Sequence, residues 1–465
     1  MKIFSSASSG FRSAATHHQA IFKGMAFVSV FVLLAKVVGA AKEMAVAYRY
    51  GAGAEVDAYL FVFNWIALPT GAWFSVLTVV LVPLSVRLKY DAASELPQFR
   101  AELFGTTLLI GAGLAMAAWI GLGFMLHSAW AGLPPRTAAL AARALVPLVF
   151  VIPLSLLCGL FSCLVLASGR HINTLLEGIP ALIIGAAVLM FAHGSIELLV
   201  WGTITGFALQ AISLAIPLVR DNEIEAPRFA WSSAQWRLFW QGFGITVVGQ
   251  ALISAQFVVD QYFAAPEGTG SIALLGYANR LFALILGIGA TAVSRATLSI
   301  FSKSEMQEGS QTHQIVLYWM RLLFLLGVSA VVLGWWLAPV AVKLLFERGT
   351  FSTQNSAAVT ELLRYGLAQL PFYLSGMVLV SYASSRRRYM LIFWSSVIAI
   401  VVKLIANTLL VPHLGLKGIT SGSALMYAST AYFLWFTLGR TKPAAREAPV
   451  RDGHEPFRDT SLRSR

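Results

Sequence analysis

The chain has 465 residues, of which 57% are hydrophobic and 12% charged, and its formal net charge is +13. Soluble domains carry roughly 25% charged residues, so this composition excludes a disordered chain, a disulfide scaffold and nearly all soluble enzymes. Nucleic-acid binding would require basic residues gathered on a water-exposed face, whereas here they separate long apolar stretches. We therefore expect an all-α polytopic membrane protein with no nucleic-acid partner.

Apolar stretches long enough to cross a membrane, about 20 residues each, recur along the chain. They predict twelve spans, at 25–48, 58–86, 103–126, 141–167, 173–193, 196–219, 240–262, 272–302, 315–345, 357–383, 391–411 and 416–439. The spans form two six-helix lobes, at 25–219 and 240–439, joined by a polar linker at 220–239. We expect a tail at 1–24 and a charged tail at 440–465 that lacks apolar periodicity and is disordered.

Basic residues fall in alternate loops, and cytoplasmic loops retain Lys and Arg. Examples are Arg87, Arg100, Arg170 and the run at 386–388. This bias predicts that both termini are cytoplasmic.

Short motifs recur at nearly the same spacing in the two halves. The matches are the segment 167–170 with 383–386, at a shift of 216, and Gly53 and Asn64 with Gly268 and Asn279, at a shift of 215. Each links a span to the sixth span after it, which indicates a duplicated six-helix unit. Because six is even, both lobes have the same orientation, and together they are expected to enclose a central cavity.

Charged residues inside the predicted spans are the strongest indication of function, because each costs at least about 2.5–3.5 kcal/mol at the bilayer centre. They are Lys36, Lys42, Glu43, Arg143, Arg280, Arg321, Lys343, Arg364 and Lys403, with Asp57 and Asp260 at helix ends. Of these, Arg143, Arg321 and Lys343 lie near enough to helix ends to extend into the interface.

Lys36 lies eleven residues into the first span, and Gly39 and Glu43 share its helical face. A Lys–Glu pair that only holds helices together is one interpretation. It leaves the remaining cations unexplained, since the embedded charges are mostly positive. A cationic cavity favours an anionic guest, and Arg and Lys bind phosphate through charge-assisted hydrogen bonds.

The sequence lacks the GxxxxGK[ST] phosphate loop and the HExxH metal motif. We therefore expect no cofactor, and transport driven by the membrane potential or an ion gradient. Pro69 and Pro371 lie within spans, where proline can kink a helix or act as a hinge.

Five motifs, taken in order, resemble those of MurJ/MviN-type lipid flippases. They are Ala35–Glu43, Gly51–Tyr59, Tyr277–Leu281, Leu344–Phe351 and Leu409–Gly418. The resemblance implies the multidrug/oligosaccharidyl-lipid/polysaccharide exporter superfamily, whose members alternate between inward-open and outward-open states in the bacterial inner membrane. It implies an undecaprenyl-pyrophosphate-linked saccharide as cargo, with membrane lipids and glycan-assembly machinery as partners.

Carried over residue by residue, the resemblance assigns pyrophosphate binding to Lys36, Lys42, Glu43 and Arg280. Arg364 and Lys403 are further candidates for substrate binding, because burying their charges inside predicted spans is costly. Gating or structural roles are expected for Asp57, Gly39, Asn64, Asn279, Pro69 and Pro371.

The sequence departs from the family pattern in three places. Its first-span cations are lysines rather than arginines, and residues 70–75 replace a family arginine pair. Third, we expect about twelve spans, without the two further C-terminal helices typical of lipid II flippases. The cargo therefore stays open between lipid II and a polysaccharide repeat unit. Other candidates are a drug/cation antiporter, which requires cavity carboxylates, and a membrane polymerase or ligase of lipid-linked glycans, which requires a large outer loop.

The orientation can be tested with reporters fused after Arg440. We expect a cytoplasmically active reporter such as green fluorescent protein to fluoresce and alkaline phosphatase to be inactive, because the loop charges place this end inside. Active phosphatase at this position would contradict the predicted orientation.

Overall fold

The computed structural model describes residues 30–91, 94–170, 172–191, 194–287, 309–386 and 388–440, and these ranges contain helices and no strand. Both predicted terminal tails, apart from Arg440, and the part of the predicted 272–302 span after residue 287 lie outside these ranges.

The first lobe begins with a helix over residues 30–50. Its further elements are α2 (Ala54–Val76), the π-helical η1 (Leu77–Leu81), α3 (Val82–Asp91), α4 (Leu96–His127), η2 (Ala129–Ala131), α5 (Pro135–Leu148), α6 (Val151–Ala167), α7 (Asn173–Leu176), α8 (Ile179–Met190) and α9 (Ile196–Arg220). The second lobe contains α10 (Trp236–Ala264), η3 (Ala265–Glu267), a helix over Ser271–Gly287, α12 (Gly309–Phe346), α13 (Thr353–Leu367), α14 (Leu370–Ser385), α15 (Tyr389–Leu414) and α16 (Leu416–Arg440).

The helices are long and apolar enough to cross a membrane. Seven of them in the described ranges meet this requirement alone, and nine do if each of two bent pairs counts as one span. The pairs are α5 with α6, bent by 49°, and α13 with α14, bent by 44°. Each of the twelve predicted spans coincides with a helix, a helix pair or a described part of one, so the predicted all-α polytopic fold is confirmed.

The two prolines predicted to kink helices differ in their surroundings. Pro371 lies at the start of α14, directly after the 44° bend, and Gly327 of α12 packs against it. A Cβ at Gly327 would lie 2.4 Å from the Cα of Pro371, so only glycine permits this approach. Pro69 lies within α2 without a break, and the irregularity follows as the π-helical turn of η1.

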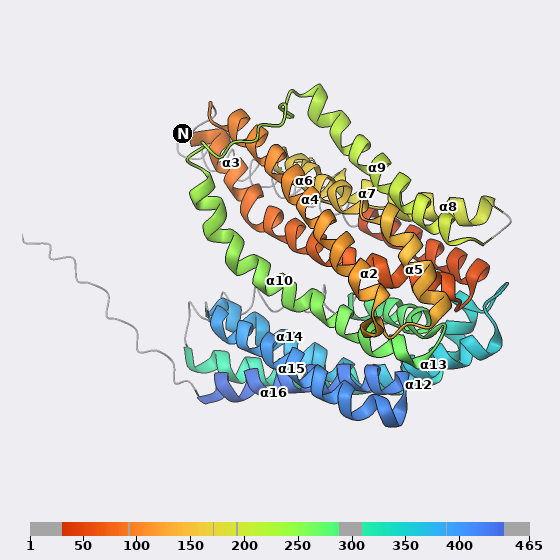
Figure 1. Cartoon of the computed structure of the whole chain (residues 1–465). Helices are drawn as coiled ribbons and strands as arrows, with labels where there is room; N and C mark the ends of the chain where they lie inside the picture. The colour runs from red at the N-terminus through yellow and green to blue at the C-terminus, as the bar shows by residue number, and fades with distance from the viewer. Residues whose placement is uncertain are drawn as a thin grey trace, which may run out of the picture.

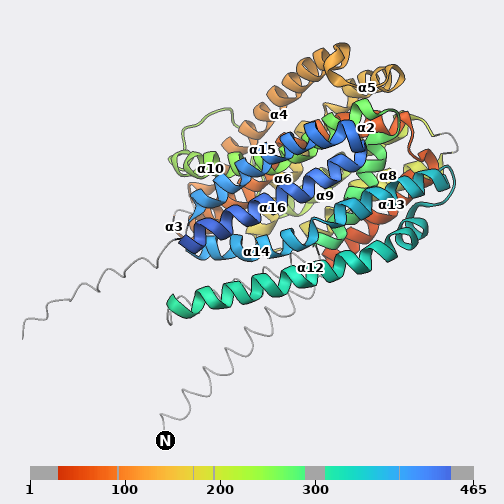
Figure 2. The same cartoon turned by 90° about the horizontal axis from the view of Figure 1, so that it is seen from below.

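The two lobes lie on either side of α10. Figure 1 shows α2 to α9 on one side of this helix and α12 to α16 on the other, and Figure 2 shows the same bundle from below. α10 packs against α2 of the first lobe and against α15 of the second. At the first contact Trp73 meets Phe239 and Phe243 edge-on, with ring centroids 6.2 Å apart in both pairs. These contacts make α10 the structural link between the lobes.

A seam of hydrogen bonds joins the lobes where the residues 30–50 helix ends and α2 begins. The buried carboxylate of Asp57 accepts from the backbone amides of Gly270 and Ala273, and so caps the Ser271–Gly287 helix of the other lobe. Thr350 donates its amide to the carbonyl oxygen of Tyr48 over 2.9 Å. The Tyr277 hydroxyl donates to the carbonyl oxygen of Gly51, also over 2.9 Å. The lobes are therefore closed against each other at this end.

The linker between the lobes, residues 221–235, is fixed to α4. Glu102, which is 1% exposed, accepts hydrogen bonds from Ser232, the Ser233 amide and the Trp236 indole. Arg228 donates its amide to the carbonyl oxygen of Ala101. This buried carboxylate thus holds the start of α10.

The seam predicts how exposure changes when Asp57 is removed. In a chain whose two native cysteines are replaced by alanine, we introduce Ser271→Cys at a buried seam position. Asp57→Ala removes a cap worth about 1–2 kcal/mol, so labelling of this cysteine by an impermeant maleimide should rise roughly 5–30-fold. The matched control is Asp221→Ala, which lies outside the seam. An unchanged labelling rate in Asp57→Ala would contradict the capping role of Asp57.

Candidate functional site

Three charged side chains from the two lobes meet at one point. Glu43, on the residues 30–50 helix, is 7% exposed, and its Oε1 atom is shared by the ammonium of Lys42 and the guanidinium of Arg280. Arg280 comes from the Ser271–Gly287 helix of the second lobe. One carboxylate therefore faces two cations, and the group, here called the Glu43 cluster, has a net charge of +1.

The two cations of the Glu43 cluster line a cavity of about 320 Å³, here called the cation chamber. Tyr59, Phe63 and Ile184 supply apolar surface to its wall. Because Lys42 and Arg280 belong to different lobes, an anion bound here would contact both. The sequence predicted these residues as a group, and the structure brings them together.

Lys36 and Gly39 continue the same helical face away from Glu43. Lys36 is exposed, and a Cβ built on Gly287 would lie 3.5 Å from its Nζ atom. A Cβ built on Gly39 would meet no atom of the described residues within 4 Å. The positive charge of Lys36 therefore lies between the lobes, beside the last described turn of the Ser271–Gly287 helix.

A second cavity, of about 240 Å³, lies inside the first lobe and is here called the polar chamber. Its lining includes three hydroxyl groups, a carboxylate and an amide, from Thr70, Ser155, Ser162, Glu177 and Gln210. Glu177, Phe207 and Gln210 line both chambers, so the two adjoin.

Glu177 and Gln210 are not among the site residues predicted from the sequence. Glu177 lies within the predicted 173–193 span, so the cost of burying charge was a usable signal for it. Gln210 is neutral, and periodicity alone does not distinguish it from other polar positions on a helix.

The two asparagines of the sequence repeat occupy different surroundings. Asn64 donates its side-chain amide to Gln261 over 2.8 Å and so joins α2 to α10 across the lobe boundary. Asn279 is half-buried and precedes Arg280 on its helix.

Lys403 lies apart from the Glu43 cluster. It is 1% exposed, and its ammonium is 2.7 Å from the carboxylate of Asp260, which links α15 to α10. The Ser423 hydroxyl of α16 accepts a further hydrogen bond from it. Lys403 lines neither chamber, and its charge is already compensated inside the second lobe.

Arg364 is also engaged within the second lobe. Its Nε atom donates to the carbonyl oxygen of Trp335 over 3.0 Å, and its guanidinium lies 5.1 Å from the centre of the Trp335 ring. It lines neither chamber. The structure therefore does not bring Arg364 or Lys403 to the other four predicted ligands.

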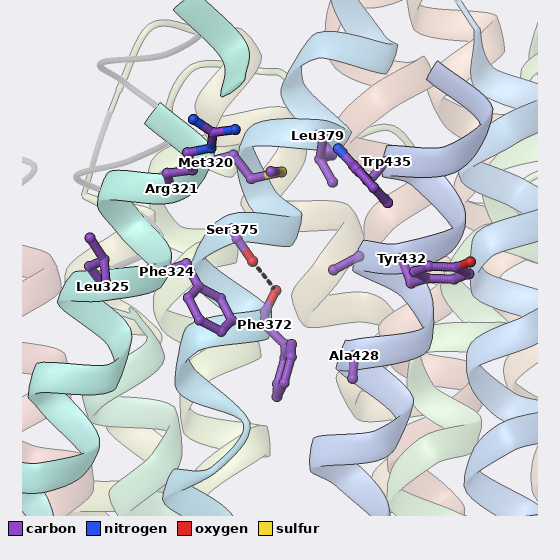
Figure 3. Close-up of a pocket in the computed structure, with 11 residues that line it drawn as sticks. Met320, Arg321, Phe324, Leu325, Phe372, Ser375, Leu379, Ala428, Tyr432 and Trp435 are labelled. Atoms are coloured by element: carbon purple, nitrogen blue, oxygen red, sulfur yellow. Dashed lines mark hydrogen bonds between the residues drawn. The ribbon is translucent and has the colours of Figure 1, made fainter. Parts of the chain in front are cut away.

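A third cavity, of about 530 Å³, lies between α12, α14 and α16 and is mostly apolar. Figure 3 shows Phe324, Phe372 and Leu379 along it, with Arg321 at one end. Ser375 donates its hydroxyl to the carbonyl oxygens of Pro371 and Phe372, and so leaves the lining apolar. This surface suits hydrocarbon rather than a charged headgroup.

The three carboxylates that the sequence offers a cation antiporter, Glu43, Asp57 and Asp260, are already engaged. Glu43 pairs with Lys42 and Arg280, and Asp57 accepts from two backbone amides. Asp260 pairs with Lys403. Within the described ranges, no group of three His, Cys, Asp or Glu side chains could hold a metal ion.

Two helical lobes that meet at a cavity, each contributing a cation to its lining, define the class, a multi-pass membrane transporter. Residues 46–452 match the family model described as "Lipid II flippase MurJ", and the chain belongs to this family.

Relatives and solved structures agree with this membership. The chain is 23% identical over 435 residues to "Lipid II flippase MurJ" of Burkholderia cenocepacia, covering 86% of this chain and 80% of the relative. It is 22% identical to "Probable lipid II flippase MurJ" of Buchnera aphidicola, covering 79% and 73%.

Among solved structures, "Lipid II flippase MurJ, inward closed conformation" matches with a TM-score of 0.77 at 17% identity, covering 90% of this chain and 88% of that chain. An inward-facing multidrug resistance MATE family transporter of the MOP superfamily matches with a TM-score of 0.69 at 15% identity, covering 87% and 94%. The predicted family and the fold, two pseudo-symmetric six-helix lobes, are thereby confirmed.

The buried Lys403–Asp260 pair yields a stability prediction. Lys403→Met leaves the Asp260 carboxylate uncompensated inside the protein, so it should destabilise the fold by about 3–5 kcal/mol. The double variant Lys403→Met/Asp260→Asn should recover most of this loss. Thermal unfolding of the purified chain in detergent measures both.

The exposed Lys417–Glu361 pair provides the control, because Lys417→Met should shift the unfolding temperature little. If the double variant were as unstable as Lys403→Met alone, charge compensation by Lys403 would be contradicted.

Proposed function

We propose that this chain flips lipid II, the undecaprenyl-pyrophosphate-linked peptidoglycan precursor, from the cytoplasmic to the outer leaflet of the bacterial inner membrane. Family membership and the names of the relatives support this cargo. The observation that most supports it in the molecule itself is the Glu43 cluster, where Lys42 and Arg280 share one carboxylate at a cavity.

The cluster favours an anion with several acceptor oxygens. The guanidinium has five N–H donors and the ammonium three, and one carboxylate oxygen cannot satisfy them all. A diphosphate entering the cation chamber replaces or joins Glu43 as acceptor, and Lys36 adds a further positive charge between the lobes. Glu43 holds the cations in place and neutralises one of them while the site is empty.

Binding across the lobes connects the cargo to the conformational change. Because Lys42 and Arg280 belong to different lobes, a diphosphate bound to both draws these lobes together around it. Release to the outer leaflet then requires the seam capped by Asp57 to open. In this proposal the 44° bend before Pro371 and the irregular turn after Pro69 are places where helices can flex, and Gly39 leaves room on the cavity face.

The remaining predicted residues receive structural roles in the proposal. Asn64 joins the lobes through Gln261, and Asn279 lies beside Arg280 on the Ser271–Gly287 helix. Lys403 compensates Asp260, and Arg364 anchors α13 to α12. None of these four contacts the diphosphate.

The membrane potential is a sufficient source of energy for an anionic headgroup. Moving one negative charge from a negative interior to the outside releases about 2.3 kcal/mol per 100 mV. The lipid tail stays in the bilayer, so only the headgroup crosses the protein. Enzymes that assemble the precursor inside and consume it outside are the expected partners, and both termini are cytoplasmic in this orientation.

Complementation tests the proposal directly. In a bacterial strain depleted of its own lipid II flippase, the chain should restore growth and the appearance of lipid II in the outer leaflet. Arg280→Ala should lose rescue, because the other lobe then has no cation in the chamber, and Arg280→Lys should retain part of it.

Arg143→Ala is the matched control, since Arg143 pairs with Glu197 at an exposed position and should rescue fully. Rescue by Arg280→Ala at normal expression would contradict the assigned role. Failure of the unmodified chain together with restored exopolysaccharide export would contradict lipid II as cargo and select a repeat unit.

A further inference from the structure

The polar chamber has an unusual lining for the interior of a membrane lobe. Four different helical regions contribute polar groups: Thr70 from α2, Ser155 and Ser162 from α6, Glu177 from the turn between α7 and α8, and Gln210 from α9. Phe74 and Phe207 supply two aromatic side chains to the same wall. Polar groups inside a membrane lobe are costly, so a set of five around one cavity indicates a ligand or water within it.

Two of these groups have no hydrogen-bond partner among the residues that the structure describes. Gln210 is 6% exposed, and its amide makes no hydrogen bond within these ranges. Glu177 is exposed rather than buried; it also has no ion pair or hydrogen bond there, and it lines both chambers. A buried amide left unsatisfied is costly, so the contents of the cavity must satisfy Gln210.

The hydroxyl groups of the chamber are oriented by the protein itself. Ser155 donates to the carbonyl oxygen of Ile152 over 2.9 Å, and Thr70 donates to that of Ala67 over 2.8 Å. Ser162 accepts from the side-chain amide of Asn173 over 3.1 Å. Each hydroxyl oxygen retains a lone pair, so the chamber can accept as well as donate hydrogen bonds.

The position of the polar chamber indicates which ligand it binds. Glu177, Phe207 and Gln210 form the boundary with the cation chamber, where Lys42 and Arg280 would hold a diphosphate. The group attached to that diphosphate is thus placed beside a carboxylate, an amide and two aromatic rings. Sugar hydroxyls can donate to the carboxylate and accept from the amide, and the apolar face of the ring can pack against phenylalanine.

We propose that the polar chamber binds the saccharide unit attached to the diphosphate of a lipid-linked glycan, with Glu177 and Gln210 as the residues that determine specificity. The inference rests on the proposed function, because it takes the diphosphate position from the cation chamber. It adds a means of selection, since a site built to hydrogen-bond a ligand disfavours analogues that lack the matching groups.

Two probes separate sugar binding from diphosphate binding. The purified full-length chain in detergent is titrated with undecaprenyl diphosphate, which has no sugar, and with lipid II. The unmodified chain should bind lipid II more tightly. Gln210→Met and Glu177→Gln should each reduce this preference roughly tenfold or more, because each removes hydrogen bonds that only the sugar makes.

The affinity for undecaprenyl diphosphate should stay unchanged in Gln210→Met. Glu177→Gln removes a negative charge from the lining of the cation chamber, so it should not weaken binding of undecaprenyl diphosphate. Gln354→Met and Glu361→Gln, at exposed positions of α13, are the matched controls and should keep the preference intact. The unfolding temperature of every variant is measured first. A variant that does not fold is replaced by Gln210→Asn or Glu177→Asp, which shorten the side chain and should reduce the same preference.

The outcomes distinguish this inference from the function on which it rests. If Gln210→Met and Glu177→Gln weaken both probes equally, or neither, the saccharide assignment is overturned while diphosphate binding stands. If Glu177→Gln changes only the pH or sodium dependence of transport, the carboxylate is an ion site and the assignment is overturned. If the unmodified chain binds neither probe, the proposed function itself fails.

Discussion

Charge inside a membrane protein must be compensated, and at the Glu43 cluster one carboxylate compensates two cations. The arrangement depends on both lobes, because Lys42 and Glu43 come from the first and Arg280 from the second. A pair of one cation and one carboxylate would offset the free-energy cost of burying its two charges and would leave no net charge. The Glu43 cluster keeps one positive charge in excess beside a cavity that Glu177 also lines, and the proposed anion binding follows from this excess within the cluster.

The rest of the structure keeps these charges opposite each other. At one end the Asp57 cap and the Thr350–Tyr48 hydrogen bond join the lobes, and along their length α10 packs against both α2 and α15. Two other buried charged groups in the described ranges are compensated within the protein: Lys403 pairs with Asp260, and Glu102 accepts hydrogen bonds from the linker. The Glu43 cluster is distinguished from these groups by its incomplete compensation and by its cavity.

The sequence predicted the fold well because hydropathy alone defines membrane spans. It also placed Lys36, Gly39 and Glu43 on one helical face, since helical periodicity determines which residues share a side. It did not predict that Lys403 pairs with Asp260, because periodicity does not identify the neighbouring helix across a bundle. Cost of burial marked Lys403 as important, and only the structure shows that its charge is already compensated.

The polar chamber illustrates a second limit. Gln210 carries no charge, and Glu177 lies near the start of a predicted span. Neither residue is among the embedded charges predicted from the sequence. Their significance comes from meeting at one cavity although they lie 33 residues apart in the sequence. Hydropathy likewise does not predict the bends at α5–α6 and α13–α14, because each of these helix pairs forms one apolar stretch in the sequence.

The central claim, that surplus positive charge at the Glu43 cluster binds a diphosphate, is tested most directly by comparing undecaprenyl diphosphate with the neutral undecaprenol. Binding of each to the purified chain should differ strongly in favour of the diphosphate. Glu43→Gln should strengthen diphosphate binding, because it removes the competing carboxylate and leaves both cations unpaired. Equal affinity for the two lipids, or weaker diphosphate binding in a folded Glu43→Gln variant, would contradict the account.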